Sequence, residues 1–191
     1  MKRLFFILVA GALTVQAVNA QFGFRAGLNI SNVHASFEGL NMDTKPILGF
    51  HAGITGDAQI AGPVYLNVSA LYSTKGFIYQ SANYHISYVE IPVNFSFKYD
   101  IGFNKAIIQA GPYLGIGVNA NYTYEGQKTK IDFGDNFDEL NMIDYGITTG
   151  LGFQFEKIVL SANYSLGLAD MGYYGAERKN RVFSFSVAWI F

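Results

Sequence analysis

The final eleven residues of the chain, R-V-F-S-F-S-V-A-W-I-F, alternate between large apolar and small or polar side chains. Successive side chains of a β-strand point to opposite faces, so a strand here has one large and one small face. This dyad pattern is typical of transmembrane β-barrel strands, which turn an apolar face to lipid and a polar face to the lumen. The large face consists of Phe183, Phe185, Val187, Trp189 and Phe191.

These five residues also resemble the C-terminal assembly signal of bacterial outer-membrane barrels, in which alternate aromatic or aliphatic residues lead to a terminal Phe. The resemblance implies that the barrel-assembly machinery of the outer membrane is a partner.

Composition supports a membrane location and excludes several functions. Only 14% of the 191 residues are charged, whereas about 25% is usual in soluble domains. The formal net charge of -1 does not favour nucleic-acid binding. Cysteine is absent, which excludes disulfides, thiolate metal sites and thiol catalysis. We expect no cofactor.

The first twenty residues have the features of a secretory signal peptide: a basic start, a short apolar segment and small residues before a cleavage site at Ala20. This predicts two parts, a signal peptide over 1–20 and an outer-membrane barrel over 21–191. No later segment has 18 consecutive apolar residues, so a membrane-spanning form requires a closed barrel.

Eight alternating stretches predict an all-β fold, an eight-stranded antiparallel up-and-down transmembrane β-barrel. They are residues 22–30, 47–57, 64–75, 87–99, 106–124, 143–155, 158–168 and 181–191.

The connections between these stretches alternate in length. Long connections on one side and tight turns on the other predict extracellular loops, periplasmic turns and periplasmic termini in a Gram-negative outer membrane. The long ones are 31–45, 76–85, 125–142 and 170–180, and the tight ones are 58–62, 100–104 and 156–157.

A soluble lipocalin-like ligand carrier is the alternative, because its barrel also alternates but turns large residues inward. The low charge, the aromatic residues near both ends of the strands and the terminal Phe191 favour the membrane barrel.

The chain also resembles the PorT-like outer-membrane barrels of Bacteroidetes. The member that names that family is associated with protein export across the outer membrane, and the resemblance implies a porin-like outer-membrane barrel. The likeness lies in an ordered set of short motifs: Gly27-Leu28-Asn29, Gly49-Phe50-His51-Ala52-Gly53, Tyr72-Ser73-Thr74-Lys75-Gly76, Glu90-Ile91-Pro92 and Ala110-Gly111-Pro112-Tyr113.

Charged and titratable residues occur at inward positions of the predicted strands. An eight-stranded barrel is just wide enough for side chains to fill it, and buried charges need partners. We therefore expect a polar network that closes the lumen and no open pore. The residues are Arg25, His51, Lys75, Glu90, Lys98 and Asp144.

One histidine and one serine have the spacing of a known catalytic pair. His85 and Ser87 share the outward face at the loop end of the predicted fourth strand, an arrangement that resembles the His-x-Ser pair of outer-membrane lipid A deacylases. A triad also needs an acid, for which Glu125 in a neighbouring loop is the candidate. We favour a non-enzymatic protein and keep an outer-leaflet lipid A hydrolase as the alternative.

One loop is acidic and forms a candidate Ca²⁺ site with Asp132, Asp135, Asp138 and Glu139. The spacing departs from the calcium-loop pattern, so we interpret it as a solvated loop without metal.

Two prolines fall in the middle of predicted strands. Pro92 and Pro112 lack the N–H donor of the β-ladder. A symmetric turn over 100–104 places Val93 opposite Pro112 and Pro92 opposite Tyr113, and predicts a bulge or a widened ladder there.

Together these patterns predict a barrel that anchors extracellular loops for adhesion, envelope organisation or support of a secretion complex. The expected partners are outer-membrane lipid and lipopolysaccharide, the assembly machinery, and a secretion or surface protein.

Overall fold

The computed structural model describes residues 20–37, 40–134, 140–171 and 176–191. The predicted signal peptide lies outside these residues, apart from Ala20. The described strands are β1 (Ala20–Phe37), β2 (Leu40–Met42), β3 (Ile47–Ala61), β4 (Val64–Tyr79), β5 (Ala82–Ile101), β6 (Asn104–Tyr124), β7 (Gln127–Ile131), β8 (Ile143–Phe155), β9 (Ile158–Gly167) and β10 (Ala176–Ile190).

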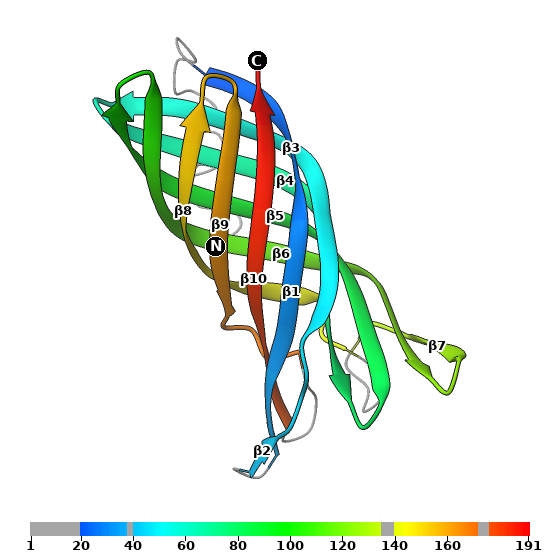
Figure 1. Cartoon of the computed structure of the whole chain (residues 1–191). Helices are drawn as coiled ribbons and strands as arrows, with labels where there is room; N and C mark the ends of the chain where they lie inside the picture. Colours follow the sequence, from blue (N-terminus) through cyan, green and yellow to red (C-terminus); the bar gives the residue numbers. More distant parts are fainter. Residues whose placement is uncertain (1–19, 38–39, 135–139, 172–175) are drawn as a thin grey trace, which may run out of the picture.

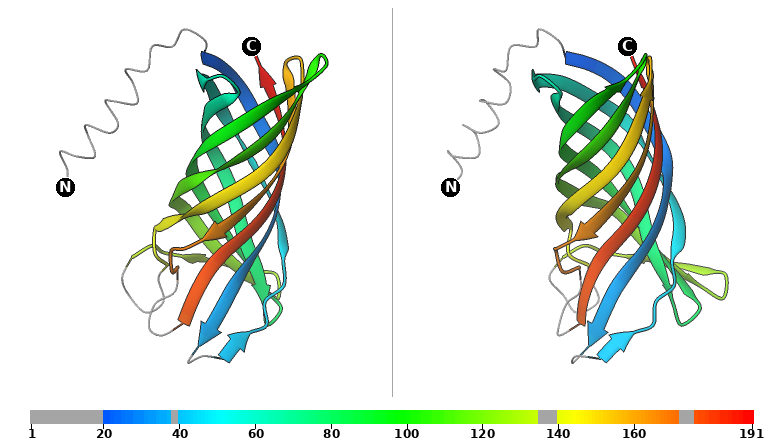
Figure 2. Two further views of the ribbon diagram at one scale, coloured as in Figure 1. Left: turned by 90° about the vertical axis from the view of Figure 1, so that its left-hand side faces the viewer. Right: turned by 60° about the vertical axis from the view of Figure 1, so that its left-hand side comes forward.

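The strands form a closed ring (Figures 1 and 2). The pairing order runs β10-β9-β8-β6-β5-β4-β3-β1, and β1 also pairs with β10 in antiparallel register. Eight strands make the wall, while β2 and β7 pair only with the extended parts of β1 and β6. The prediction of an eight-stranded antiparallel up-and-down barrel is confirmed.

The two ends of the barrel differ (Figure 1). Tight turns follow β3, β5 and β8, at the end where the chain stops, and we call this the short-turn end. The long connections, β2 and β7 lie at the other end, the long-loop end.

The wall has an apolar outer face and a polar inner face. Large outward side chains are exposed, such as Leu48 at 70% and Phe24 at 64%, whereas inward Asn29 is exposed by only 2%. A soluble carrier turns its large side chains inward, so that alternative is wrong for this chain. Within the described residues, no helix has the length and apolar character needed to cross a membrane.

The strands extend further at the long-loop end than the sequence predicts. The expected loop over 76–85 is wrong: β4 continues to Tyr79, β5 starts at Ala82, and Gln80 and Ser81 form the turn with φ of 46° and 66°. Tight hairpins with positive φ usually carry Asn-Gly or Asp-Gly, so the Gln-Ser dipeptide did not indicate this turn.

The two prolines interrupt pairing without changing the register. Pro92 faces Tyr113 as predicted, and the ladder resumes at Phe95 and Ala110, so the pairs that would involve Val93 and Asn94 are missing. Neither the predicted bulge nor the predicted widened ladder is present here: the strands stay close, because a Cβ atom at Gly111 would lie 1.9 Å from the Val93 carbonyl oxygen and 2.8 Å from Asn94 Cα.

The bulge of this hairpin lies nearer the long-loop end. Ser87 pairs with Asn119 and Tyr88 pairs with Gly117, which leaves Val118 as an extra residue in β6. One extra residue exchanges the two faces of the strand beyond it. Asn119, expected inside, is therefore exposed, and Ala120 is fully buried.

Candidate functional site

The lumen is filled with polar side chains from every strand of the ring. The buried charged residues among those described are three cations and three anions, namely Arg25, Lys75, Lys98, Asp57, Glu90 and Asp144. Burying a charge is costly unless a partner compensates it, so the contacts of these six side chains decide whether the lumen is stable. They form three groups along the barrel.

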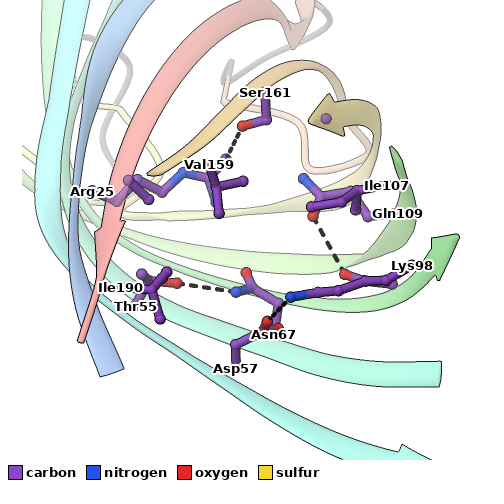
Figure 3. Close-up of a pocket in the computed structure, with 13 residues that line it drawn as sticks. Arg25, Thr55, Asp57, Asn67, Lys98, Ile107, Gln109, Val159, Ser161 and Ile190 are labelled. Carbon is purple, nitrogen blue, oxygen red and sulfur yellow. Dashed lines mark hydrogen bonds and ion pairs between the residues drawn. The ribbon is translucent and has the colours of Figure 1, made fainter. Parts of the chain in front are cut away.

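The first group centres on Lys98, near the short-turn end (Figure 3). The Lys98 ammonium forms an ion pair with Asp57, donates a hydrogen bond of 3.1 Å to Gln154 Oε1, and lies 4.4 Å from the ring centroid of Tyr65. Asp57 was missed as a lumen residue because it lies at the end of the predicted strand, although it shares the parity of Thr55.

The second group joins Arg25 and His51 across the middle of the barrel. Arg25 donates hydrogen bonds to the hydroxyls of Ser186 and Ser161, at 3.3 and 3.4 Å. The two ring nitrogens of His51 lie 2.8 Å from Asn29 Oδ1 and 2.8 Å from Ser186 Oγ. Figure 3 shows Arg25 directed toward Ser161.

Gly27 makes room for the His51 ring. A Cβ atom at this position would lie 2.5 Å from Cε1 of His51 and would also collide with the backbone of Phe185. A side chain here would therefore displace His51 from its hydrogen-bond partners.

The third group surrounds Lys75. Its ammonium forms ion pairs with Glu90 and with Asp144, the latter at 3.1 Å, and lies 4.5 Å from the ring centroid of Tyr113. Asp144 also accepts hydrogen bonds from Asn180 Nδ2 at 2.9 Å and from the Tyr113 hydroxyl at 3.3 Å. Tyr113 has the inward parity of Gly111, which identifies it from the sequence, whereas Asn180 falls at the end of the predicted loop 170–180.

These contacts leave little free space. Two lumen cavities measure about 30 Å³ each, and Arg25 lines both of them. Such a volume holds one or two water molecules. The described interior is therefore a packed polar core and not an aqueous channel.

An apolar layer covers this core toward the long-loop end. It includes Val33 from β1, Phe77 from β4, Ile86 and Tyr88 from β5, and Ala120 from β6. Tyr88 is fully buried, and its hydroxyl lies 3.0 Å from the Met171 sulfur. The layer separates the polar lumen from the loops.

The three catalytic candidates are not assembled into a triad. Ser87 is buried beside the bulge, His85 is half-buried, and Glu125 is exposed in the turn between β6 and β7 with φ of 48°. No hydrogen bond links any two of them in the described part of the chain. Ser87 therefore has no hydrogen-bonded base to activate it among the described residues.

The acidic-loop candidates are only partly described. Asp132 is exposed and forms an ion pair of 2.5 Å with Lys130. Asp135, Asp138 and Glu139 lie outside the described residues. Among the residues that the structure describes, no group of three or more His, Cys, Asp or Glu side chains is placed to hold a metal ion.

The terminal strand closes the ring against β1. Its alternate residues Phe183, Phe185, Val187, Trp189 and Phe191 lie on the outer face and are 40–61% exposed. A closed β-ring with an apolar outer face and a charge-compensated interior is the architecture of a transmembrane β-barrel. Family comparison agrees: a model described as outer membrane protein beta-barrel domain matches residues 16–172. The chain belongs to this family of outer-membrane barrels.

Several solved outer-membrane barrels resemble the structure at low sequence identity. Ail of Yersinia pestis is 16% identical, with 90% of this chain and 99% of that chain covered and a TM-score of 0.48. Neisserial surface protein A is 16% identical, with 88% and 97% covered and a TM-score of 0.48. The N-terminal barrel of OprF from Pseudomonas aeruginosa is 10% identical, with 86% and 97% covered and a TM-score of 0.40. No curated protein matches the chain at the sequence level.

Proposed function

We propose that this protein is a non-enzymatic outer-membrane anchor whose closed barrel presents the long-loop end to the cell exterior. Both termini then lie in the periplasm, and residues 1–20 serve as the signal peptide for export. The observation that carries the proposal is the filled lumen. The buried charges have partners inside the barrel, and apolar side chains cover the lumen at the long-loop end. Such a closed barrel suits attachment better than transport.

The long-loop end is where such an anchor makes contacts. β4 and β5 extend as a hairpin to a tight turn at Gln80 and Ser81, and β7 lengthens the neighbouring strand β6. Paired strands hold their positions better than free loops. Surface adhesion, envelope organisation and support of a secretion complex all require this kind of platform, and the PorT-like motifs favour the last of these.

Lipopolysaccharide is the proposed lipid partner. Arg181 is exposed on the outward face of β10, two residues beyond the lipid-facing Phe183, and Lys179 follows with the same parity. Basic side chains just beyond the apolar belt suit the phosphate groups of lipid A. The alternating aromatic pattern of the terminal strand supports the barrel-assembly machinery as the second proposed partner.

Epitope tags test the orientation. A tag in the turn at Gly126, at the long-loop end, is expected to bind antibody on intact cells. A tag in the turn at Gly102, at the short-turn end, serves as the matched control and should react only after permeabilisation. The opposite labelling would contradict the proposed function.

Conductance tests the closed lumen. Purified protein in planar bilayers should give no steady single-channel current, because cavities of about 30 Å³ do not form a continuous water path. A reproducible open channel from the intact chain would contradict the anchor.

A further inference from the structure

An apolar groove crosses the outer face of the wall, in the half nearer the short-turn end. It has a volume of about 240 Å³, and its surface is almost entirely apolar. The groove spans four successive strands of the ring, β1, β3, β4 and β5. The outward residues that line it are Phe22, Ile54, Gly56, Val68, Ala70 and Ile91.

Two small residues form the floor of the groove. Gly56 in β3 pairs with Val68 in β4, and Ala70 in β4 pairs with Ile54 in β3. Each small residue therefore lies across from a large one, and together they leave a depression between Ile54 and Val68. A Cβ atom at Gly56 would lie 3.5 Å from Cε1 of the Phe22 ring, so that ring lies beside the glycine and forms one side of the groove.

The ladder under the groove is interrupted. The pairing of β4 with β5 stops at Val68 and resumes at Leu71, so the pairs of Ser69 and Ala70 are missing. The register places Pro92 opposite Ser69, and proline has no N–H to donate to a ladder. This part of the wall has fewer backbone hydrogen bonds than its surroundings, so it depends more on the packing of its outer face.

The position of the groove decides which molecules can fill it. The chain belongs to the outer-membrane barrels, whose outer face meets the hydrocarbon of the bilayer. The groove is continuous with that lipid-facing surface, because Phe22 and Ile54 on its rim are 61% and 59% exposed. An empty groove loses the dispersion contacts of its lining, and the hydrocarbon supplies no water to fill it. An apolar chain is therefore the expected occupant.

The volume suits a segment of one acyl chain. An apolar cavity of about 150 Å³ already binds benzene, and this groove is larger. An acyl chain follows the shape of a groove because its single bonds rotate, whereas the side chains of a second barrel are tied to a rigid wall. A stable protein interface also needs about 20–30 residues a side, and only eight of the described residues line the groove. Lipid is therefore a better occupant than a second copy of the chain.

Two features place the groove toward the short-turn end. The Phe22 carbonyl accepts a hydrogen bond of 2.9 Å from the backbone N–H of Phe191, which lies at that end. Gly56 and Val68 lie close to the tight turn that joins β3 and β4. In the proposed orientation this end is periplasmic. The periplasmic leaflet of an outer membrane consists of phospholipid, whereas lipopolysaccharide occupies the outer leaflet.

We propose that this groove binds one acyl chain of a phospholipid in the periplasmic leaflet. Gly56 and Ala70 make room for the chain, and Phe22, Val68 and Ile91 contact it. The bound chain covers the interrupted ladder between β4 and β5. The choice of leaflet rests on the proposed function, whereas the choice of an acyl chain rests on the groove itself.

Photolabelling of the full chain tests the proposal. The probe is a phosphatidylethanolamine with a diazirine in its acyl chain, in vesicles of phosphatidylethanolamine and phosphatidylglycerol, and mass spectrometry of peptides locates the adducts. Labelling of the groove should exceed labelling of Leu48 and Leu151 by about tenfold. These two residues face lipid at 70% and 63% exposure but lie outside the groove.

Matched variants separate the groove from general contact with lipid. Ala70→Phe fills the groove and should lower its labelling by about tenfold, and the smaller Ala70→Leu should lower it less. Ala110→Phe adds the same ring at an outward alanine of β6 that does not line the groove, and it should leave the labelling unchanged. The gel mobility of unboiled samples shows whether each variant is folded.

Several outcomes would overturn the assignment. Equal labelling of the groove, Leu48 and Leu151 would show bulk lipid contact without a site, and so would unchanged labelling in folded Ala70→Phe. Stronger labelling of the groove by a lipid A probe with the same diazirine would overturn the choice of phospholipid. Labelling in these vesicles does not depend on which end faces outward. A reversed result with the epitope tags would therefore refute the proposed function and the choice of leaflet, and leave the groove as an acyl-chain site.

Discussion

Replacing Lys75 by Met tests whether charge compensation holds the lumen together. The Lys75 side chain is 1% exposed and lies between Glu90 and Asp144, which are 12% and 0% exposed. Met retains the aliphatic length but removes the cation that Glu90 and Asp144 share, so the lumen is left with one buried carboxylate in excess. Breaking a buried ion pair in this way costs about 3–5 kcal/mol. We expect Lys75→Met to lower the free energy of unfolding by that amount.

A second substitution, which removes one of the two carboxylates, tests the same argument in the opposite direction. Arg25 is close enough to Glu90 for electrostatic attraction, so Lys75→Met combined with Asp144→Asn leaves two balanced pairs in the lumen: Arg25 with Glu90, and Lys98 with Asp57. The double variant should recover at least about half of the lost stability, because no carboxylate is then left uncompensated.

Urea unfolding in lipid vesicles, followed by the gel mobility of unboiled samples, measures both variants. Lys105→Met is the control, because Lys105 forms a 3.5 Å pair with Asp100 at the surface, and such exposed pairs contribute about 0–1 kcal/mol. Identical unfolding curves for Lys75→Met and Lys105→Met would refute the argument. A double variant less stable than the single one would refute it equally.

Three further predictions concern the outer face. Trp189→Ala with Phe191→Ala should lower the yield of folded barrel in cells, whereas Phe103→Ala, in an exposed turn, should not; equal membrane levels would exclude an assembly role. Expression of the protein should leave the acyl chains of lipid A unchanged by mass spectrometry, and chain removal that Ser87→Ala abolishes would establish the hydrolase. Arg181→Ala should weaken retention of phosphorylated lipid A in native mass spectra but not of its dephosphorylated form, and equal loss of both would remove the phosphate contact.

The wall of the barrel could be predicted from the sequence because its signal has a period of two residues and repeats in every strand. The terminal strand illustrates this. The alternate residues Phe183, Phe185 and Val187 fix which face of the strand meets lipid. Because a closed barrel has no free edge, the last strand must then pair with the first, β1. The predicted pairing of Pro92 with Tyr113 was also correct, since a tight symmetric turn sets the register of a hairpin.

The long-loop end of the barrel could not be predicted in the same way. Gln80 and Ser81 adopt positive φ without the residues that usually indicate such a turn, so the sequence predicts a loop where paired strands continue. The extra residue Val118 exchanges the faces of β6, and alternation alone cannot locate such a change. The stacking of Phe77, Tyr84 and Tyr122 at this end joins three strands, so no local pattern indicates it.

The bulge at Val118 makes the molecule two modules that share one continuous strand. Before it, odd-numbered residues of β6 such as Tyr113 face the lumen; beyond it, Ala120 is fully buried and Tyr122 stacks on Tyr84. A deletion of one residue here would turn Tyr122 away from Tyr84 while leaving every lipid-facing residue of the wall in place. The side-chain packing of β6 at the long-loop end therefore depends on one extra residue, which the register of the wall before it does not need.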